Sequence, residues 1–245
     1  MRTILVVNDD GIGANGIQRL AKALTKYGKV YVIAPEKERS AASHSIVFRR
    51  PIAVEPYDFP VEGVTAYTCD GQPADCVRLG CLALLPEKPD VVFSGINHGY
   101  NVGTDIQYSA TVGAAFEADY LGCHAVAVSE GMFDANVVTD AYLDEIIAKT
   151  IDMEVPKGYI INVNVPDGDL SEIKGFKTGV TVAREYFHED TYTKVEEMEN
   201  GGMKFEVSGV LVNNVIPGTD YEAVFNKYIS VGVVSNIGVD TTFSV

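Results

Sequence analysis

Two acidic residues, Asp9 and Asp10, stand side by side in the stretch VVNDDGIGANG, directly after a run of β-prone residues. Carboxylates at the end of a strand can hold a divalent cation, and a cation held in this way can bind a phosphate group. One of the two carboxylates can also accept a proton from an attacking water. The pair is therefore a candidate metal centre and a candidate catalytic group, with a helix-capping turn as the alternative interpretation.

The same stretch contains a second pattern, G-x-G-x-x-G, formed by Gly11, Gly13 and Gly16. After a strand this pattern cradles the pyrophosphate of a dinucleotide, and Glu36 lies where a ribose-binding acid is expected. The two aspartates oppose this interpretation. A fixed charge about 4 Å from a phosphate oxygen costs on the order of 4 kcal/mol at an effective dielectric of 20, and a bound cation reverses the sign of that interaction.

Two later loops offer neutral oxygen atoms that a hard cation can use. Ser40 lies in PEKERSAASHS and Asn97 lies in SGINHGYNVGTDIQYSAT, and no cluster of cysteines or histidines indicates zinc. Taken singly, each of these residues is also an ordinary turn residue. Together with Asp9 and Asp10 they predict a site for one divalent cation per subunit, Mg²⁺ or Mn²⁺.

Other polar residues of these loops could act on a phosphate ester. His44 lies in the second loop, where it could donate a proton to the leaving group or bind a phosphate oxygen. Ser109 and Thr111 begin an expected helix, so their hydroxyls and the free amides of that helix start could grip phosphate oxygens or serve only as a cap. The predicted substrate- and phosphate-binding residues are Ser40, Ser43, Asn101, Ser109 and Thr111.

The elements that must position these loops are strands alternating with helices. The apolar patterns predict strands at 4–7, 30–35, 64–69, 90–95 and 124–129, with helices near 17–24, 74–85 and 109–121. Strands that are apolar on both faces indicate a mostly parallel, doubly wound α/β sheet covered on two sides. Ligands bind such sheets beyond the carboxyl ends of the strands, where the three polar loops should meet.

The pattern changes after residue 130. A helix around 140–151 and the strand YIINVNV are followed by TVAREYF and KFEVSGVLV, which predict a projecting β-ribbon at about 177–212. The final stretch DYEAVFNKYISVGVV predicts a helix that passes into a strand. We therefore expect residues 1–130 to form the core with its site, and 131–245 to form the rest of the core and a smaller ribbon and helix extension.

Composition restricts the classes of partner and the location. The chain has 245 residues, a formal net charge of -15 and a pI near 4.6, which argues against a nucleic-acid duplex as partner. Its apolar runs are too short to cross a bilayer or to form a signal-peptide core, so we expect no membrane association and a cytoplasmic location. Its four cysteines include no C-x-x-C pair and are expected to be reduced.

Five motifs taken together resemble, in order and spacing, those of the SurE survival-protein family of metal-dependent 5'-nucleotidases. They are NDDG, ERSAASHSI, GQPADCV, SGINHGYNVG and SATVGAAFEA, and they span nearly all of residues 3–130. The resemblance implies a Rossmann-like core, metal ligands at Asp9, Asp10, Ser40 and Asn97, and hydrolysis of nucleoside monophosphates. It also implies activity of some members on other small phosphoesters, and a homodimer or homotetramer with exchange of the C-terminal region.

Two residues depart from the family pattern. The family usually has glycine where this chain has Ser43, and often arginine where this chain has His98. We predict a phosphomonoesterase acting on nucleoside 5'-monophosphates, with 3'-monophosphates as further candidate substrates. The alternatives are an NAD-type oxidoreductase using GIGANG and a nucleotide-binding module without catalysis.

Overall fold

The computed structural model describes residues 1–133, 135–185, 188–212 and 215–236. Its strands are β1 (Thr3–Val7), β2 (Lys29–Pro35), β3 (Val54–Tyr57), β4 (Thr65–Cys69), β5 (Val91–His98), β6 (His124–Glu130), β7 (Tyr159–Val165), β8 (Phe176–Val180), β9 (His188–Glu197), β10 (Met203–Leu211) and β11 (Ile229–Ser235). Its helices are α1 (Asn15–Leu24), α2 (Pro73–Leu79), α3 (Ala110–Tyr120), α4 (Ala135–Thr150) and α5 (Asp220–Phe225), with short helical turns η1 (Gly80–Leu84), η2 (Gly103–Gln107) and η3 (Leu170–Glu172).

Six parallel strands in the order β4-β2-β1-β5-β6-β7 form the centre of a nine-stranded sheet. Antiparallel β3 extends one edge beside β4, and β11 lies antiparallel beside β7 with β8 beyond it. The order of the six parallel strands is that of a doubly wound Rossmann-type sheet, and the winding reverses between β1 and β5. The predicted fold class is confirmed.

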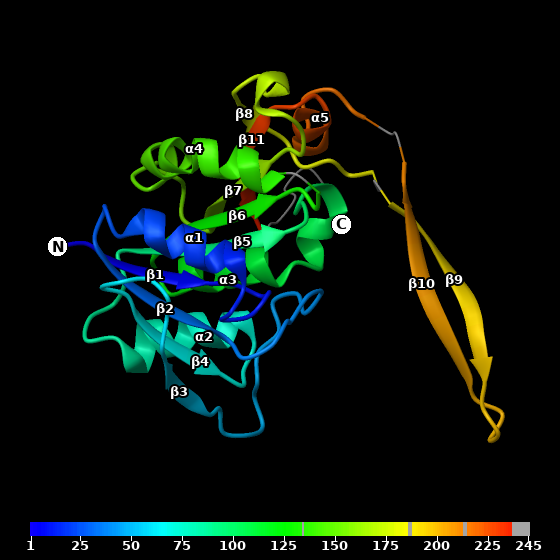
Figure 1. Cartoon of the computed structure of the whole chain (residues 1–245), viewed down its shortest axis with the longest axis horizontal. Helices are drawn as coiled ribbons and strands as arrows, with labels where there is room; N and C mark the ends of the chain where they lie inside the picture. The colour runs from blue at the N-terminus through cyan, green and yellow to red at the C-terminus, as the bar shows by residue number, and fades with distance from the viewer. Residues whose placement is uncertain (134, 186–187, 213–214, 237–245) are drawn as a thin grey trace, which may run out of the picture.

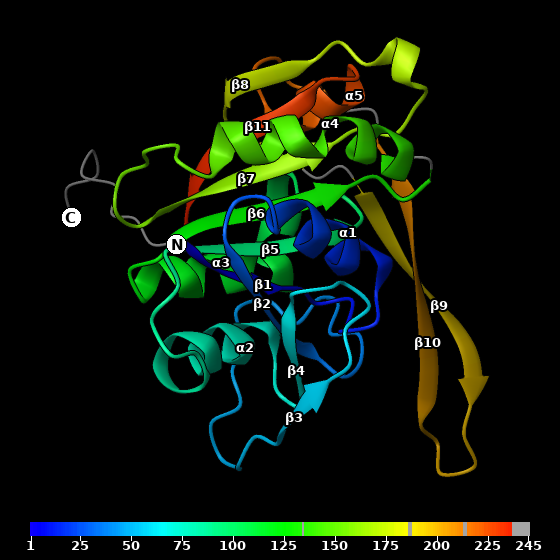
Figure 2. The ribbon, with the colours of Figure 1, turned by 60° about the vertical axis from the view of Figure 1, so that its left-hand side comes forward.

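The helices cover both faces of the sheet, as Figure 1 and Figure 2 show for α1 and α4 on one face and α2 and α3 on the other. Alternate residues of β1 therefore enter two separate cores. Ile4 packs with Ile17 of α1 and Ile146 of α4, whereas Leu5 packs with Val112 of α3, and all five side chains are fully buried. This double burial explains why the central strands are continuous apolar runs.

The C-terminal third completes the sheet and adds a projecting hairpin. The hairpin, β9 with β10, forms its own two-stranded sheet that extends away from the body (Figure 1). It spans 188–211, which is shorter than the ribbon predicted at 177–212, because 176–180 join the main sheet as β8. The predicted ribbon stretch TVAREYF includes residues 186–187, which lie outside the described residues.

The predicted passage from helix to strand near the C-terminus is present as α5 and β11. Both pack on the sheet of their own chain, with β11 paired to β7 and β8. Among the described residues, none of the helices is both long and apolar enough to cross a membrane.

Candidate functional site

The loops that follow β1, β2 and β5 meet beyond the carboxyl ends of these strands, at the point where the winding of the sheet reverses. There they enclose a cavity of about 380 Å³ together with the segment that leads into α3. The predicted site residues that line it are Asp9, Ser40, Asn97, Asn101 and Ser109. The topology thus brings residues from three separate loops to one place, as expected for an open α/β sheet.

Asp9 is the buried acid of this cavity, with only 3% of its surface exposed. The hydroxyl of Thr111, at the start of α3, donates a hydrogen bond to its Oδ1. Burial raises the pKa of Asp9 to about 6; the charge of Asp10 acts in the same direction, and the Thr111 hydrogen bond opposes both. This hydrogen bond holds the Asp9 carboxylate in one orientation at the edge of the cavity.

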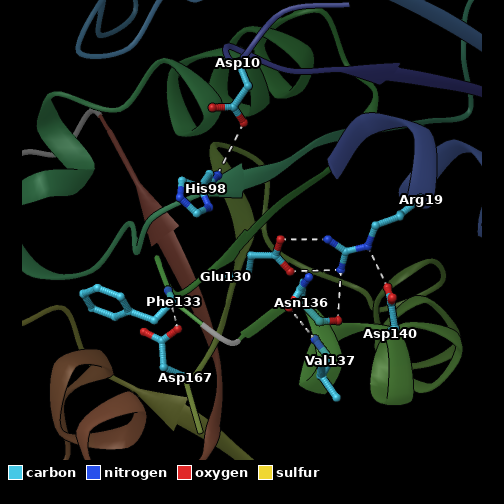
Figure 3. Close-up of polar contacts among 9 residues, drawn as sticks. All are labelled: Asp10, Arg19, His98, Glu130, Phe133, Asn136, Val137, Asp140 and Asp167. Carbon is cyan, nitrogen blue, oxygen red and sulfur yellow. Dashed lines mark hydrogen bonds and ion pairs between the residues drawn. The ribbon is translucent and has the colours of Figure 1, made fainter. Parts of the chain in front are cut away.

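Asp10 faces the opposite side of the same strand end. Its Oδ2 accepts the backbone N–H of His98 at 3.4 Å, and burial raises the pKa of its carboxyl group. Figure 3 shows this carboxylate pointing at the His98 backbone, near the pair formed by Arg19 and Glu130. Asp10, Arg19 and Glu130 line a second cavity of about 470 Å³, so the two aspartates border different cavities.

Ser40 and Asn97 supply neutral oxygen atoms to the first cavity. The hydroxyl of Ser40 donates to Oε1 of Glu38 at 2.7 Å, and the side-chain amide nitrogen of Asn97 donates to the carbonyl of Gly99 at 2.8 Å. This second bond fixes the amide so that its oxygen is the atom left to serve as a ligand. Two carboxylates, a hydroxyl and an amide oxygen form the hard donor set that Mg²⁺ and Mn²⁺ prefer.

No group of three or more His, Cys, Asp or Glu that could hold a metal exists within the described part of the chain. A site built only from such residues, as zinc requires, is therefore not formed there. The candidate centre differs in kind because half of its predicted ligands, Ser40 and Asn97, are neutral oxygen donors.

Ser43 and His44 lie where the second loop packs on α3. A Cβ atom on Gly113 would come within 2.7 Å of the Ser43 carbonyl oxygen, so this close packing needs glycine in the helix. Ser43 has φ 53° and its hydroxyl donates to the carbonyl of Gln107 at 2.9 Å. The residue at which the chain departs from the family's usual glycine therefore adopts a backbone conformation that favours glycine.

His44 is directed at helix α3. Its Nε2 lies 2.8 Å from Oε2 of Glu117, and its ring stacks on Tyr120 with centroids 5.5 Å apart. Glu117 also accepts from Arg78 at 2.8 Å, and the hydrogen bond with His44 is the largest cause of its lowered pKa. His44 does not line the 380 Å³ cavity.

Ser109 and Asn101, which line the cavity, also have structural partners, whereas the predicted phosphate-binding residue Thr111 is fully buried and does not line the cavity. The hydroxyl of Ser109 caps α3 by accepting the Val112 N–H at 3.1 Å. Asn101 is held by buried asparagines: its N–H donates to Oδ1 of Asn164 at 2.7 Å, and its carbonyl accepts the side-chain N–H of Asn162 at 2.8 Å. These bonds hold the backbone of the cavity-lining Asn101 in place.

The glycine pattern has a packing role in this fold. A Cβ atom on Gly16 would lie 2.2 Å from the carbonyl oxygen of Ile96, so α1 can approach β5 only with glycine at this position. The third glycine of G-x-G-x-x-G is thereby explained without a dinucleotide.

Eight cavity-lining residues were absent from the site predicted from the sequence, among them Asp105, Tyr108, His188 and Asp190. Tyr108 directly precedes the helix cap Ser109, which is the one local signal that could have identified it. His188 and Asp190 come from the start of the hairpin, so only the tertiary fold brings them to the site.

Comparison with known proteins agrees with these features. Residues 4–188 match the family model described as Survival protein SurE. The chain is 37% identical over 238 residues to the 5'-nucleotidase SurE of Thermosipho melanesiensis, covering 95% of this chain and 91% of that protein. It is 41% identical over 236 residues to the 5'/3'-nucleotidase SurE of Proteus mirabilis, covering 94% and 89%.

A crystal structure of the SurE protein from Aquifex aeolicus shares the fold. It matches with a TM-score of 0.79 and 34% identity, over 95% of this chain and 93% of that one. With the family model matching three quarters of its length and close relatives aligned nearly end to end, this chain belongs to the SurE survival-protein family.

Proposed function

We propose that this protein hydrolyses nucleoside 5'-monophosphates to a nucleoside and phosphate, with one divalent cation per subunit, Mg²⁺ or Mn²⁺. The observation that carries the proposal is the convergence of Asp9, Ser40 and Asn97 on one cavity, with Asp10 adjoining Asp9. The relatives from T. melanesiensis and P. mirabilis are named nucleotidases, and the second name supports 3'-monophosphates as further substrates. These names give no support to an NAD-type oxidoreductase.

Asp9, Asp10, Ser40 and Asn97 would hold the cation, which when bound supplies positive charge for the phosphate and acidifies a water molecule. The chain's own residues prepare the rest of the reaction. Thr111 holds the Asp9 carboxylate at the cavity, where it can accept a proton from the attacking water. The remaining free amides at the start of α3, next to the cavity-lining cap Ser109, would bind phosphate oxygens.

The charge balance explains why a cation is needed. The chain carries a formal net charge of -15, and the cavity contains the acids Asp9, Asp105 and Asp190. A phosphate dianion would be repelled by such a lining, and a local cation reverses that interaction.

The proposal is tested by measuring phosphate release from AMP with Mg²⁺ or Mn²⁺, and again after addition of EDTA. We expect turnover that depends on the metal and is abolished by EDTA. Phosphate release that persists in EDTA would contradict the metal site, and NADH binding without phosphate release would favour the oxidoreductase.

Substitution of a neutral ligand sharpens this test. Asn97→Ala removes one oxygen without changing the charge of the site, so it should raise the metal concentration required for half-maximal activity by about 10-fold or more and be rescued at high metal. Glu36→Gln is the matched control, because this exposed acid matters only in the dinucleotide interpretation. Wild-type metal affinity in Asn97→Ala would place Asn97 outside the ligand set.

We further propose that the protein forms a homodimer or homotetramer through the β9–β10 hairpin. Six large apolar side chains of the hairpin are each more than half exposed: Tyr192, Val195, Met203, Phe205, Val207 and Val210. A two-stranded hairpin is marginal by itself in water, and exposed apolar surface of this kind marks contact with another chain.

Replacing residues 189–210 by a short Gly-Ser linker should therefore yield monomers by light scattering while the melting transition of the body is retained. This deletion spares α5 and β11, which belong to the main sheet. An unchanged molar mass would remove the hairpin from the interface.

A further inference from the structure

The 380 Å³ cavity continues into a second space of about 350 Å³. This extension lies between η2 and the first residues of β9. The two spaces share four lining residues, which are Asp105, Tyr108, His188 and Asp190. A ligand whose phosphate lies near Asp9 can therefore extend past Tyr108 into the second space.

The backbone of Tyr108 is held in place by hydrogen bonds, while its ring is exposed. Its backbone N–H donates to the carbonyl of Asp105 at 3.0 Å, and its carbonyl accepts the Ser43 N–H at 2.9 Å. With its backbone held from both sides, Tyr108 nevertheless leaves 63% of its surface exposed. It precedes the α3 cap Ser109, so the ring lies beside the place proposed for the phosphate.

The extension and the end of the cavity near Asp9 suit different parts of a ligand. Asp105 and Asp190 line the extension, and Nδ1 of His188 lies 3.8 Å from Oδ2 of Asp105. Carboxylates accept hydrogen bonds from hydroxyl and amino groups but repel phosphate. The extension therefore suits the neutral sugar and base of a nucleotide, and its acids keep the phosphate at the cation end.

From this geometry we infer that the nucleoside part of the substrate occupies the extension, with its base stacked on the ring of Tyr108 and its donor groups facing Asp105 and Asp190. The inference rests on the proposed function for the phosphate end, and it identifies Tyr108 as the residue that distinguishes nucleotides from simple phosphoesters. Stacking on an aromatic ring tolerates every base, because each base has a π-face.

The 470 Å³ cavity on the other side of Asp10 offers the competing position. It contains an exposed aromatic residue of its own, Phe133, which is 79% exposed and whose N–H donates to Oδ1 of Asp167 at 2.9 Å (Figure 3). Of the four proposed metal ligands, however, this cavity contains only Asp10, whereas the 380 Å³ cavity contains the other three. Phe133 therefore provides a matched control for Tyr108.

The test compares kcat/KM for AMP with kcat/KM for ribose 5-phosphate, which carries the same phosphate and sugar but no base. In Tyr108→Ala the ratio of the two values should fall by roughly 5- to 100-fold, the range expected for loss of one base-stacking ring. In Tyr108→Phe, which keeps the ring, and in Phe133→Ala the ratio should stay within about 2-fold of the wild type. A ratio that falls in Phe133→Ala and not in Tyr108→Ala would overturn the inference.

Calorimetric titration of AMP into the full-length protein with Mg²⁺ separates this inference from the proposed function. Weaker AMP binding by Tyr108→Ala than by Tyr108→Phe, without phosphate release by the wild type, would overturn the hydrolase and support the nucleoside position. Hydrolysis of AMP and ribose 5-phosphate with a ratio insensitive to Tyr108 would overturn the nucleoside position and leave the hydrolase standing.

Discussion

Nε2 of His44 and Oε2 of Glu117 lie 2.8 Å apart, joining the loop after β2 to the middle of helix α3. Glu117 also binds Arg78 of α2, so one carboxylate ties three segments together. The loop that contains Ser40 is thereby anchored on the same helix whose first turn contacts Asp9. This relationship leads to two predictions.

The first prediction concerns stability and pH. Hydrogen bonds from His44 and Arg78 lower the pKa of Glu117 below its ordinary value of 4.5, so its stabilising contribution is present above pH 4.5 and is lost as the pH falls through the folded-state pKa. Glu117→Gln should lower the free energy of unfolding by about 1–2 kcal/mol at pH 7 and by less in acid. Urea denaturation at pH 7 and pH 3.5 measures this difference.

The exposed pair of Glu145 with Lys149 on α4 supplies the control for that measurement. Glu145→Gln should change the free energy of unfolding by less than about 0.5 kcal/mol at both pH values. Equal effects of the Glu117 and Glu145 substitutions at pH 7 would contradict the anchoring role.

The second prediction separates a positioning role of His44 from the proton-donor role predicted from the sequence. Because its imidazole contacts Glu117 and does not line the cavity, we expect His44→Ala to slow AMP and p-nitrophenyl phosphate by a similar factor, about 10-fold. A proton donor would matter only for the poor leaving group of AMP, since p-nitrophenolate leaves without help. A loss of about 10²- to 10⁴-fold confined to AMP would establish the proton donor instead.

The third prediction concerns the two aspartates without metal. Burial and mutual repulsion of two adjacent carboxylates destabilise the metal-free fold, so Asp10→Asn should raise its melting temperature by about 2–4 °C, as expected for about 1 kcal/mol in a chain of this size. Adding Mg²⁺ or Mn²⁺ should stabilise the wild type and have little effect on this variant. Calorimetry with and without metal decides, and equal metal-induced shifts in both proteins would remove Asp10 from the ligand set.

The fourth prediction concerns the left-handed backbone of Ser43. Ser43→Gly relieves a conformational cost of about 1 kcal/mol and loses one hydrogen bond to Gln107 of similar worth, so its stability should stay within about 0.5 kcal/mol of the wild type. Ser43→Ala loses the bond and keeps the cost, so it should be destabilised by about 1 kcal/mol. Urea denaturation compares the two variants, and a more stable alanine variant would contradict this account.

The sequence predicted the elements whose signals are local. The central strands are runs of apolar residues because both faces are buried, and the helices between them repeat with helical spacing. Strand β3 was not predicted, because it is a partly exposed edge strand interrupted by Pro56. The start of the hairpin was placed too early, because β8 and β9 are both short of buried residues and give the same alternating pattern.

The candidate site likewise contains residues that could be predicted from the sequence and contacts that depend on the tertiary fold. Asp9, Asp10, Ser40 and Asn97 could be proposed together because the carboxyl ends of neighbouring parallel strands meet at one edge. The partner of His44 is 73 residues away along the chain, so no local pattern could pair it with Glu117. The approach of His188 to Tyr108 likewise depends on where the hairpin leaves the body.

The arrangement of the sheet also bears on how the chain is made. Strands β1 to β6 and the loops that contain every proposed metal ligand lie within residues 3–130, whereas β11, between β7 and β8, is formed by residues 229–235. During synthesis the half that contains the site can assemble as it leaves the ribosome, since domains fold from the N-terminal side first. The edge of β7 stays open to other strands until residues 229–235 have been synthesised, so a ribosome stalled before residue 229 would leave a nascent chain that contains the proposed metal ligands but whose β7 lacks its partner β11.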